Sequence, residues 1–576
     1  MKQEYFENLK KIDTHDVAMT LKKDVWETCS ELKHHAKCVS YAYVLYRIAE
    51  QNNANAEDFE HFIESINLAE DVIEALRRNI EGMWDPIKKM KNKYDKEQLA
   101  AFILFDNFSA SSKTGTTSTP EGISKLACSI LNIKKGEHVL DLCSGKGGFL
   151  IEAFEANQGA FFKGVELNYA CNDIAIIRGD ILGAKIECKL HDVFDYGGTE
   201  KFDKVFSNYP FGVKIPANSK YRHRMQELFS MSKDDVRRTS ADWVFNATMI
   251  KQMDSTGKAV AIMTNGSAWN SIDKNVRKYF IEHGYVEMAI ALPTRLFENT
   301  LISVTMVVFS RNNETVKLVD ARKFFSKKDR FHYLSNTDVN NIIDVIRGKS
   351  SDCIIKNIDD FAEDEYVLNP IRYLEPSPEI ENGVVFGTVI KNITRGAQLK
   401  ARELEKLKSE EATNYQYLML SNINDGIICF EEKQFLKGLD EKLLKYCIKN
   451  NTIVLSKVGI PMFKSAVAQI DDNKELLATG NMFVIELDET KANPFYIQAL
   501  LDSELGRALL KSIYTGATLH TISMEKLKKL RIPLPSIQEQ ERIGNRYAAC
   551  IDEVVLLKKR LEKTIAKMKH IYDEEV

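Results

Sequence analysis

The sequence lacks several features that would assign it to a familiar class. Its ten cysteines are spread from Cys29 to Cys550 without a CxxC pair, which excludes a disulfide framework and a paired-cysteine zinc ribbon. No run approaches the roughly 18 apolar residues of a membrane-spanning helix, and the opening stretch MKQEYFENLKKIDTHD has no apolar signal core. We therefore expect a cytoplasmic protein with no membrane partner.

Net charge is also nearly absent. The 79 Lys and Arg residues almost balance the 82 Asp and Glu residues, so a nucleic-acid partner would have to be met by local basic patches. The sequence has no GxxxxGK[ST] phosphate loop and no evident nuclease constellation, so any DNA cleavage would reside in another chain. Near the amino terminus, Cys29, His34, His35 and Cys38 do not have the spacing of a structural zinc site. We interpret them as helix-packing residues and expect no metal.

The pattern along the chain predicts a multidomain α/β protein, as its length of 576 residues suggests. Apolar residues recur at helical spacing over residues 1–105, which predicts a helical amino-terminal domain. Over residues 106–376, short apolar runs such as HVLDL, FKGVEL and AVAIMT alternate with helical patterns. This alternation is typical of a parallel sheet with crossover helices. The proline-marked stretch LNPIRYLEPSPEIENG then indicates a linker.

After the linker we expect an α+β domain over residues 384–535 and one long helix over residues 536–576. Apolar residues recur in this helix every seven residues, in two interleaved series: Tyr547, Val554, Leu561 and Met568, and Cys550, Leu557 and Ile571. Two interpretations stay open: a helix packed on its own domain, and a coiled coil formed with a like helix.

Four successive strand ends carry residues suited to a nucleotide-like cofactor. HVLDLCSGKGGFL is a strand ending at Asp141, a turn with Gly145 and Gly147, and the start of a helix. The next strand ends at Glu166, where an acid suits a ribose diol, and the third strand end carries Asp192, which suits an adenine amino group. Each acid alone is typical of a solvated turn or helix cap. Their succession favours a binding site.

The fourth strand end, SNYPFG, extends this series. Together with the glycine turn it resembles the motifs of S-adenosylmethionine-dependent amino-methyltransferases. A closer resemblance is to the modification subunits of type I restriction-modification systems, carried by GTTSTPEGISKLACSIL, FDKVFSNYPFG, ADWVFNATMIKQMDSTGKAVAIMTNGSAW and YVLNPIRYL in the expected order. The resemblance implies a Rossmann-like methyltransferase domain with S-adenosylmethionine as cofactor. The cofactor-binding residues that it implies are Thr119, Pro120, Asp141, Cys143, Ser144, Gly145, Gly147, Glu166, Asp192 and Asn208.

The resemblance also implies four catalytic residues, Asn208, Tyr209, Pro210 and Phe211. An adenine amino group is a poor nucleophile, and the Asn208 side chain and a backbone carbonyl from the next residue would accept its two hydrogens. Phe211 would stack on the base, which must flip out of the duplex. Tyr209 stands where the family usually has its first proline. Because the acceptor there is a main-chain carbonyl, we expect activity to survive.

The part after the linker resembles one target-recognition domain and one spacer helix of a type I specificity subunit, here fused to the methyltransferase. The segments that carry this resemblance include FGTVIKNITRGAQLKARE and LRIPLPSIQEQERI. A homodimer through the carboxy-terminal helices would place two recognition domains on double-stranded DNA with two-fold symmetry. A separate restriction subunit is a further possible partner.

Two basic stretches are candidates for DNA contact. Residues 213–240 hold seven Lys or Arg against three acids and include Lys220, Arg222 and Arg224. The second stretch, MEKLKKLR, offers Lys526, Lys528 and Lys529. A solvated loop or helix face is the alternative for both.

These observations predict a site-specific DNA adenine methyltransferase of a restriction-modification or related defence system. Two alternatives remain open: a catalytically weak DNA-recognition or scaffold subunit, and an amino-methyltransferase that acts on RNA or on protein glutamine.

Overall fold

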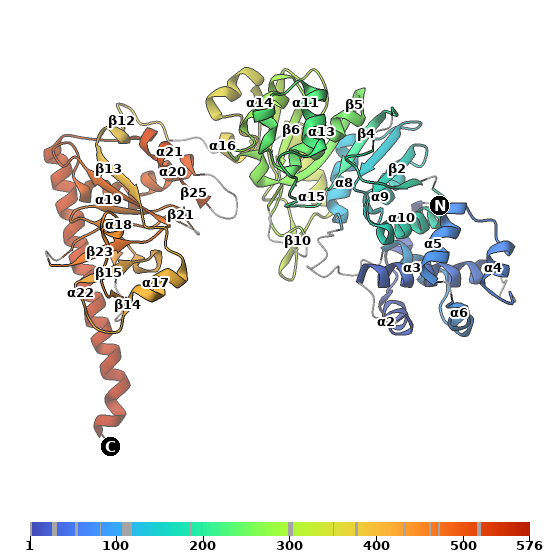
Figure 1. The fold of residues 1–576 in the computed structure, drawn as a ribbon, viewed down its shortest axis with the longest axis horizontal. Helices are drawn as coiled ribbons and strands as arrows, with labels where there is room; N and C mark the ends of the chain where they lie inside the picture. The colour runs from blue at the N-terminus through green and yellow to red at the C-terminus, as the bar shows by residue number, and fades with distance from the viewer. Residues whose placement is uncertain are drawn as a thin grey trace. The chain divides into compact units, whose positions relative to one another are not determined.

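The chain forms two compact units, Met1–Leu374 and Glu375–Val576 (Figure 1). The structure is a computed structural model that describes residues 3–25, 31–51, 56–80, 82–105, 118–184, 186–196, 199–297, 303–348, 351–374, 378–429, 434–459, 462–470, 473–514 and 520–575. The predicted boundaries at 105/106 and 535/536 do not divide compact units, because the amino-terminal helices belong to the first unit and the long carboxy-terminal helix to the second.

The described residues before 106 form helices joined by short loops. The helices are α1 (Gln3–Leu9), α2 (His15–Asp24), α3 (Glu31–Gln51), α4 (Phe59–Ser65), α5 (Glu70–Ile80), α6 (Trp84–Met90) and α7 (Lys96–Phe105). Helix α3 is the centre of this group, since its Tyr41, Tyr43 and Val44 are fully buried and it packs on α5, α7 and α10. The helical part is thereby joined to the sheet that follows.

The first unit is built on a nine-stranded sheet with the order β11-β8-β6-β7-β5-β4-β1-β2-β3. Its strands are β1 (His138–Leu142), β2 (Phe161–Glu166), β3 (Ile186–Leu190), β4 (Phe202–Ser207), β5 (Met253–Thr264), β6 (Val286–Ala291), β7 (Val304–Phe309), β8 (Thr315–Asp320) and β11 (Cys353–Asn357). The first five strands pair in parallel, as predicted. The sheet as a whole is mixed, because β7 runs antiparallel between β5 and β6, and β11 runs antiparallel to β8.

Helices cover both faces of this sheet. They are α8 (Glu121–Leu131), α9 (Gly148–Ala156), α10 (Tyr169–Leu182), α11 (Lys220–Phe229), α12 (Lys233–Arg237), α13 (Ala241–Gln252), α14 (Lys274–Glu282), α15 (Asn336–Ile346) and α16 (Ile371–Leu374), with 3-10 turns η1 (Asn265–Ala268) and η2 (Ile358–Asp364). One core contains Leu126, Phe149 and Ile174 from α8, α9 and α10, while Trp243 and Phe280 from α13 and α14 lie in another. A short hairpin, β9 (Ser326–Lys328) and β10 (Phe331–Tyr333), projects from this body (Figure 1).

The second unit contains a four-stranded sheet, β13-β24-β20-β22, and a five-stranded sheet, β14-β18-β15-β23-β19. Its strands are β12 (Val384–Val385), β13 (Ile390–Arg395), β14 (Lys408–Ser409), β15 (Tyr415–Leu418), β16 (Ile423–Asn424), β17 (Ile427–Ile428), β18 (Phe435–Leu436), β19 (Cys447–Ile448), β20 (Ile453–Ser456), β21 (Val458–Gly459), β22 (Ser465–Val467), β23 (Glu475–Ala478), β24 (Met482–Leu487), β25 (His520–Thr521) and β26 (Arg531–Ile532). Its helices are η3 (Phe386–Thr388), α17 (Ala401–Leu407), η4 (Leu420–Asn422), α18 (Glu441–Leu444), α19 (Pro494–Asp502), α20 (Glu504–Ile513), α21 (Met524–Lys529) and α22 (Ile537–Glu575).

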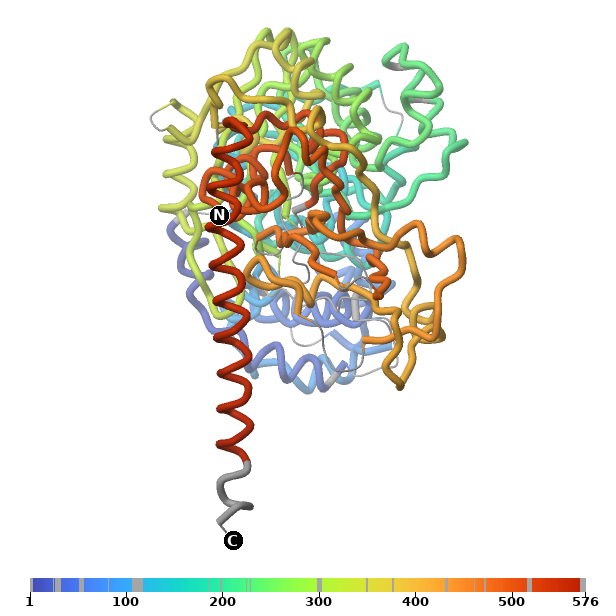
Figure 2. The backbone as a smooth tube through the Cα atoms, turned by 90° about the vertical axis from the view of Figure 1, so that its left-hand side faces the viewer, coloured from blue at the N-terminus to red at the C-terminus, as the bar shows by residue number. Residues whose placement is uncertain are grey.

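Helix α22 has two different halves. In its first half it packs on α19, where Gln540 is buried and the Tyr547 hydroxyl donates to the Asp502 carboxylate. Its second half extends away from the unit (Figure 2). There the apolar side chains are largely exposed: Leu556, Leu557, Leu561, Ile565 and Met568. The helix therefore packs on its own unit over one half and leaves an apolar stripe uncovered over the other.

Candidate functional site

The turn after β1 is shaped by residues in left-handed backbone conformations. Cys143, Gly145 and Gly147 have φ values of 79°, 54° and 78°. A side chain at Gly147 would also crowd α10, since its Cβ would lie 3.2 Å from the Cβ of Ala175. The turn leads directly into α9, so backbone N–H groups gather at the amino end of that helix.

Glu166 at the end of β2 is held against this turn. Its Oε2 accepts a hydrogen bond from the Gly145 N–H at 2.9 Å, and its Oε1 accepts one from the Asn168 N–H at 2.7 Å. Burial raises the pKa of this carboxyl, against the effect of the backbone donors. Each carboxylate oxygen has a second acceptor position, so Glu166 can still receive hydroxyl donors.

Asp192 follows β3 and is held in a similar way. Its Oδ1 accepts from the Phe194 N–H at 3.0 Å, and its Oδ2 accepts from the Tyr221 hydroxyl at 3.0 Å. Tyr221 on α11 is a contact that the sequence did not indicate, because it is one residue in a basic stretch whose pattern predicted only surface charge. The two acids thus stand at neighbouring strand ends with their orientation fixed.

Asp141 is placed differently from the expectation that it lies at a strand end. It is one residue inside β1, paired with Gly164 and Phe206, and it is 2% exposed. Burial raises the pKa of its carboxyl well above the usual range, and the charge of Glu166 acts in the same direction. Asp141 therefore lies behind the glycine turn and does not line the cavity in front of it.

Asn208 follows β4 and presents a fixed amide. Its Nδ2 donates to the Thr119 hydroxyl oxygen at 3.0 Å, which directs the amide. Its Oδ1 is buried and accepts no hydrogen bond from the residues that the structure describes. Ser207 fixes the strand end below it by donating to the carbonyl of Leu142 at the end of β1. A buried, unused acceptor is costly, so this oxygen is suited to receive a donor from outside the chain.

The Tyr209 side chain turns away from the cavity into the core. It is 1% exposed, its ring stacks on Phe245 with 4.6 Å between centroids, and its hydroxyl donates to the Asn246 Oδ1 at 3.1 Å. The Tyr209 side chain therefore fills space behind the strand end. Phe211 lies in front, where its ring meets that of Phe297 edge-on at 5.3 Å.

A cavity of about 760 Å³ opens at the carboxyl ends of β1, β2, β3 and β4. It lies where the strand order reverses between β1 and β4, the usual position of a ligand in open α/β sheets. Of the predicted residues, Thr119, Pro120, Asp141, Ser144, Gly147 and Tyr209 do not line it. Its lining is Ser118, Cys143, Gly145, Lys146, Val165, Glu166, Leu167, Asn168, Cys171, Asp192, Val193, Phe194, Asn208, Pro210, Phe211, Gly212, Val213, Lys214, Ile215, Pro216, Tyr221 and Phe245.

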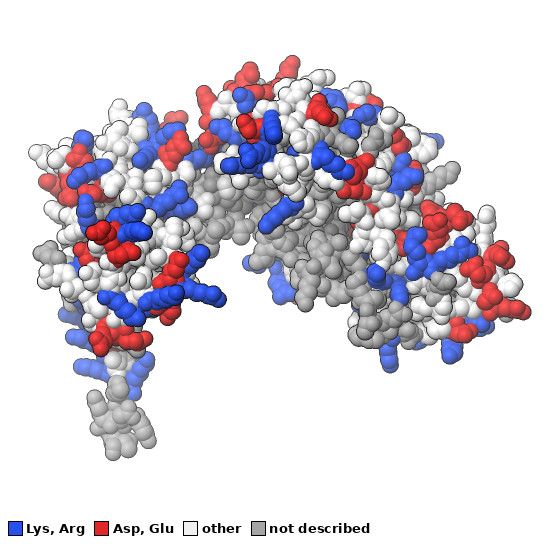
Figure 3. All heavy atoms as spheres, in the orientation of Figure 1, with Lys and Arg blue, Asp and Glu red and all other residues white. Residues whose placement is uncertain are grey.

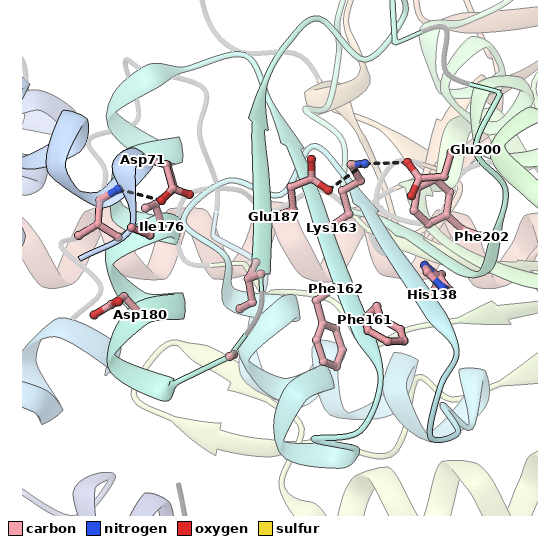
Figure 4. Close-up of a pocket in the computed structure, with 14 residues that line it drawn as sticks. Asp71, His138, Phe161, Phe162, Lys163, Ile176, Asp180, Glu187, Glu200 and Phe202 are labelled. Carbon is pink, nitrogen blue, oxygen red and sulfur yellow. Dashed lines mark hydrogen bonds and ion pairs between the residues drawn. The ribbon is translucent and has the colours of Figure 1, made fainter. Parts of the chain in front are cut away.

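Another cavity, of about 520 Å³, lies at the opposite edge of the same sheet (Figure 4). It is bordered by His138 and Phe161, which begin β1 and β2, and by Lys163. The Lys163 ammonium is paired with Glu187 at 3.0 Å and with Glu200 at 2.6 Å. The Lys163 ammonium at this cavity is thus already neutralised by acids of the same chain.

Arg222 is not the exposed cation that the sequence predicted. It is buried on α11, and its guanidinium donates to the carbonyls of Ile215, Pro216 and Val236 at 3.0, 3.1 and 2.6 Å. It therefore holds the chain after the SNYPFG stretch in place, a role that spacing alone could not distinguish from a phosphate contact.

The other predicted DNA contacts are at or near the surface. Lys220 pairs with Asp195 at 2.7 Å, and the side chain of Arg224 lies outside the described residues. The three lysines of the second stretch lie on α21, where Lys529 pairs with Glu525 at 2.9 Å. Figure 3 shows charges of both signs interspersed over this face of the units.

No helix among the described residues is long and apolar enough to cross a membrane. Nor does any group of three or more His, Cys, Asp and Glu side chains in that part of the chain have an arrangement that could hold a metal ion.

Known proteins resemble the two parts of the chain separately. Residues 101–382 match the family described as N-6 DNA methylase, and residues 397–566 match the type I restriction modification DNA specificity domain. The HindI methylase subunit of Haemophilus influenzae is 24% identical over 52% of this chain and 73% of its own length. The MjaIX methylase subunit of Methanocaldococcus jannaschii is 25% identical over 51% of this chain. The chain spans 57% of the length of that second relative.

Solved structures of restriction-modification proteins also resemble the chain, at lower sequence identity. A type I methyltransferase subunit from Streptococcus thermophilus is 17% identical, with a TM-score of 0.47, over 62% of this chain and 98% of its own. The type IIG restriction endonuclease BpuSI is 12% identical, with a TM-score of 0.49, over 92% of this chain and 74% of its own.

The strand order β3-β2-β1-β4-β5-β7-β6, with β7 antiparallel, is that of the S-adenosylmethionine-dependent methyltransferases. Within this class, residues 101–382 match the N-6 DNA methylase family. One type I specificity domain follows in the same polypeptide, as the sequence predicted.

Proposed function

We propose that this chain transfers a methyl group from S-adenosylmethionine to the 6-amino group of adenine in DNA, in the cavity at the carboxyl edge of the sheet. The observation that carries the proposal is the amide of Asn208. Its nitrogen is engaged by Thr119 at 3.0 Å, and its buried oxygen has no donor among the described residues.

The residues around the cavity fit the cofactor. Glu166 and Asp192 stand at neighbouring strand ends with acceptor positions that suit a ribose diol and an adenine amino group. The turn at Gly145 brings backbone close to the cavity without a side chain in the way. When bound, S-adenosylmethionine supplies an electrophilic methyl group on a sulfonium centre. Asp141 supports the turn from behind.

The target amino group would be activated by acceptors of the chain. The Asn208 Oδ1 and the main-chain carbonyl of Tyr209 accept hydrogen bonds from the two N–H groups of the adenine amine. These bonds favour a pyramidal nitrogen, whose lone pair is no longer delocalised into the ring. Phe211, which lines the cavity, stacks on the flipped base. The Tyr209 ring anchors this stretch to the core, so that its carbonyl is held in place.

The specificity domain favours DNA over RNA or protein glutamine as the substrate. We further propose that two chains associate through the second half of α22, where Leu557, Leu561 and Met568 are spaced as in a coiled coil and are exposed by 53%, 59% and 66%. Such a dimer would read a two-fold symmetric, bipartite site. A separate restriction subunit would be a further partner.

The dimer is tested by light scattering. We expect the mass of two 65.7 kDa chains at micromolar concentration. The double variant Leu557→Glu/Leu561→Glu should give the mass of one chain. A single-chain mass for the unaltered protein, with and without DNA, would remove the proposed association.

The methyl transfer is tested by expressing the chain in a bacterial host that lacks adenine methylation and mapping modified bases by single-molecule sequencing. We expect one sequence motif to carry N6-methyladenine, and Asn208→Ala to abolish it while S-adenosylmethionine still binds. If Asn208→Ala modifies DNA as well as the unaltered chain, Asn208 has no part in the reaction. If the unaltered chain binds cofactor but modifies no base, the scaffold alternative takes precedence.

A further inference from the structure

A basic hairpin projects from the first unit and has no part in the site described above. It comprises residues 322–333, RKFFSKKDRFHY, which carry five Lys or Arg, one Asp and four aromatic residues. Strands β9 and β10 pair through the register Lys328–Phe331 and Lys327–His332, with Asp329 in a left-handed conformation in the two-residue turn. This is a ribbon with a high density of positive charge.

The hairpin starts at the edge of the sheet that carries the cavity. Strand β8 is parallel to β6, and both β5 and β6 are antiparallel to β7, so β8 ends at the same edge as β5. Strand β5 is parallel to β4, which ends just before Asn208. The hairpin begins shortly after β8, and therefore arises on the catalytic side.

Contacts at its base connect the hairpin to the site. The His332 N–H donates to the Arg295 carbonyl at 3.0 Å, and its Nδ1 lies 2.7 Å from the Thr294 carbonyl. Two residues after Arg295, Phe297 meets the ring of Phe211 at 5.3 Å. The loop that contacts the proposed base-stacking residue is thus the loop that holds the hairpin.

The hairpin is also held against α8 and α15. Gly122 in the first turn of α8 permits a close approach, because a Cβ there would lie 2.3 Å from the Leu334 carbonyl oxygen. The Ser326 hydroxyl donates to Asp338 at 2.8 Å. Gly122 is three residues from Thr119, which binds the Asn208 amide. The ribbon is therefore anchored at both ends beside the catalytic residues.

The two faces of the ribbon differ. Lys327 and His332 lie opposite each other on one face, where the His332 ring stacks on Phe325 at 4.0 Å between centroids. Because alternate residues of a strand lie on opposite faces, Lys328, Phe331 and Tyr333 share the other face. Tyr333 is 46% exposed, and Arg330 lies over the Phe331 ring at 5.0 Å.

Three cations of the ribbon form no ion pair among the described residues, although Asp329 lies between two of them in the turn. Lys327, Lys328 and Arg330 are exposed, and none pairs with a carboxylate of the described residues. By contrast, Arg322 and Lys323 at the base pair with Asp320 and Asp352 at 2.7 and 2.6 Å. Unpaired like charges on a two-stranded ribbon repel one another, and an anionic surface would remove that cost.

We propose that this hairpin binds the phosphate backbone of the DNA duplex beside the flipped adenine, as a sequence-independent contact of the methylase unit. The proposal rests on the function proposed above. A two-stranded ribbon fits a DNA groove, and Lys and Arg on it would neutralise phosphates while Tyr333 packs on the sugars. The contact would keep the duplex against the cavity whichever sequence the second unit reads.

The test measures DNA affinity and not methyl transfer. The probe is a fluorescent duplex of about 40 base pairs of arbitrary sequence, titrated with the full chain at several salt concentrations. The variant Lys327→Ala/Lys328→Ala/Arg330→Ala should bind about 10- to 100-fold more weakly, and its log affinity against log salt should be less steep by about 2 to 3. The charge-conserving variant Lys327→Arg/Lys328→Arg/Arg330→Lys should retain the slope.

A matched control removes three exposed lysines near the opposite edge, Lys134, Lys135 and Lys201. The proposal is overturned if the hairpin and control variants have the same affinity and slope, as they would if the hairpin bound a protein partner. An unaltered chain that binds no duplex also overturns it. Unchanged affinity for S-adenosylmethionine would show that a variant is folded. If the triple variant does not fold, the three single substitutions are used in its place, and each should make the slope of log affinity against log salt less steep by about 0.9. If the hairpin variants lose affinity while the unaltered chain transfers no methyl group, only the proposed reaction fails.

Discussion

The nine-stranded sheet has a cavity at each of its two edges, and the two cavities differ in how their polar groups are used. At the amino edge the ammonium of Lys163 is paired with Glu187 and Glu200 at 3.0 and 2.6 Å. At the carboxyl edge the Asn208 Oδ1 is buried without a donor among the described residues. The cavity volumes, about 520 and 760 Å³, do not by themselves indicate which of the two cavities binds a ligand. Unused hydrogen-bonding capacity is the better guide to function.

The largest expected effect concerns how each edge is supported. The Tyr209 side chain lies in the core behind the end of β4, whereas Phe161 at the amino edge is 50% exposed. We expect Tyr209→Ala to lower the free energy of unfolding by about 3–5 kcal/mol, and Phe161→Ala by about 1 kcal/mol or less. Chemical denaturation of the two variants measures this difference. Equal losses of unfolding free energy would mean that the residues behind the carboxyl edge are packed no better than those at the amino edge.

Glu166 and Glu187 are acids at the carboxyl and amino edges of the sheet. Glu166→Ala removes the acceptor of the Gly145 and Asn168 N–H groups and should weaken S-adenosylmethionine binding about 10- to 100-fold, the loss of one or two charged hydrogen bonds. Glu187→Ala at the amino edge should leave that affinity within about twofold. Isothermal titration calorimetry measures both. A similar loss in both variants would contradict the assignment of the cofactor to one edge.

A smaller effect extends the comparison to two acids that contact one lysine. Glu152 and Glu121 both lie near the ammonium of Lys10, at 3.4 and 3.3 Å. Burial raises the pKa of Glu152 from 4.5 to about 7. The pKa of Glu121 is lowered: burial would raise it, but Lys125 and Lys10 outweigh that effect.

The folded chain therefore holds a proton on Glu152 that the unfolded chain loses, and stability should fall as the pH rises from 4.5 to about 7. Glu152→Gln should make this pH-dependent loss of folding stability smaller by about 1–3 kcal/mol. Glu121→Gln should instead lessen the loss of stability on acidification below its usual pKa. Denaturation midpoints measured from below pH 4.5 up to about 7 distinguish the two. An unchanged profile in Glu152→Gln would mean that its carboxyl is ionised in the folded chain.

The smallest expected effect is at the amino edge itself. Lys163→Met breaks the ion pairs with Glu187 and Glu200, which are themselves largely exposed, and should cost about 1 kcal/mol or less of stability. The rate of methyl transfer should stay within about twofold. A loss of methylation above tenfold, at unchanged stability, would show that the amino edge takes part in function.

Much of the first unit could be predicted from its sequence because its signals are local. Alternating apolar runs and glycine turns determine strands β1 to β5 and their parallel pairing, and the acids at 166 and 192 follow strands that the hydrophobic pattern already marks. The antiparallel insertion of β7 could not be predicted, since a buried strand reads as the same apolar run in either direction.

The site departs from the sequence-based expectation where tertiary contacts decide. Arg222 is buried by three carbonyls that no spacing relates to it, and Asp141 recedes behind the glycine turn. The Tyr209 ring fits into the core because it stacks on Phe245 and its hydroxyl donates to Asn246, both on α13. The basic hairpin was missed for a similar reason, because only the sheet topology brings it to the catalytic edge.

The division of the chain between Leu374 and Glu375 has a consequence for inheritance. The methylase and the domain that matches the specificity family are encoded in one reading frame but fold as separate compact units. If the second unit selects the DNA site, as proposed, recombination near the codons of this junction would replace that unit and leave the methylase unit unchanged. Such an exchange would change the methylated sequence in one event, with the two parts always made in equal number.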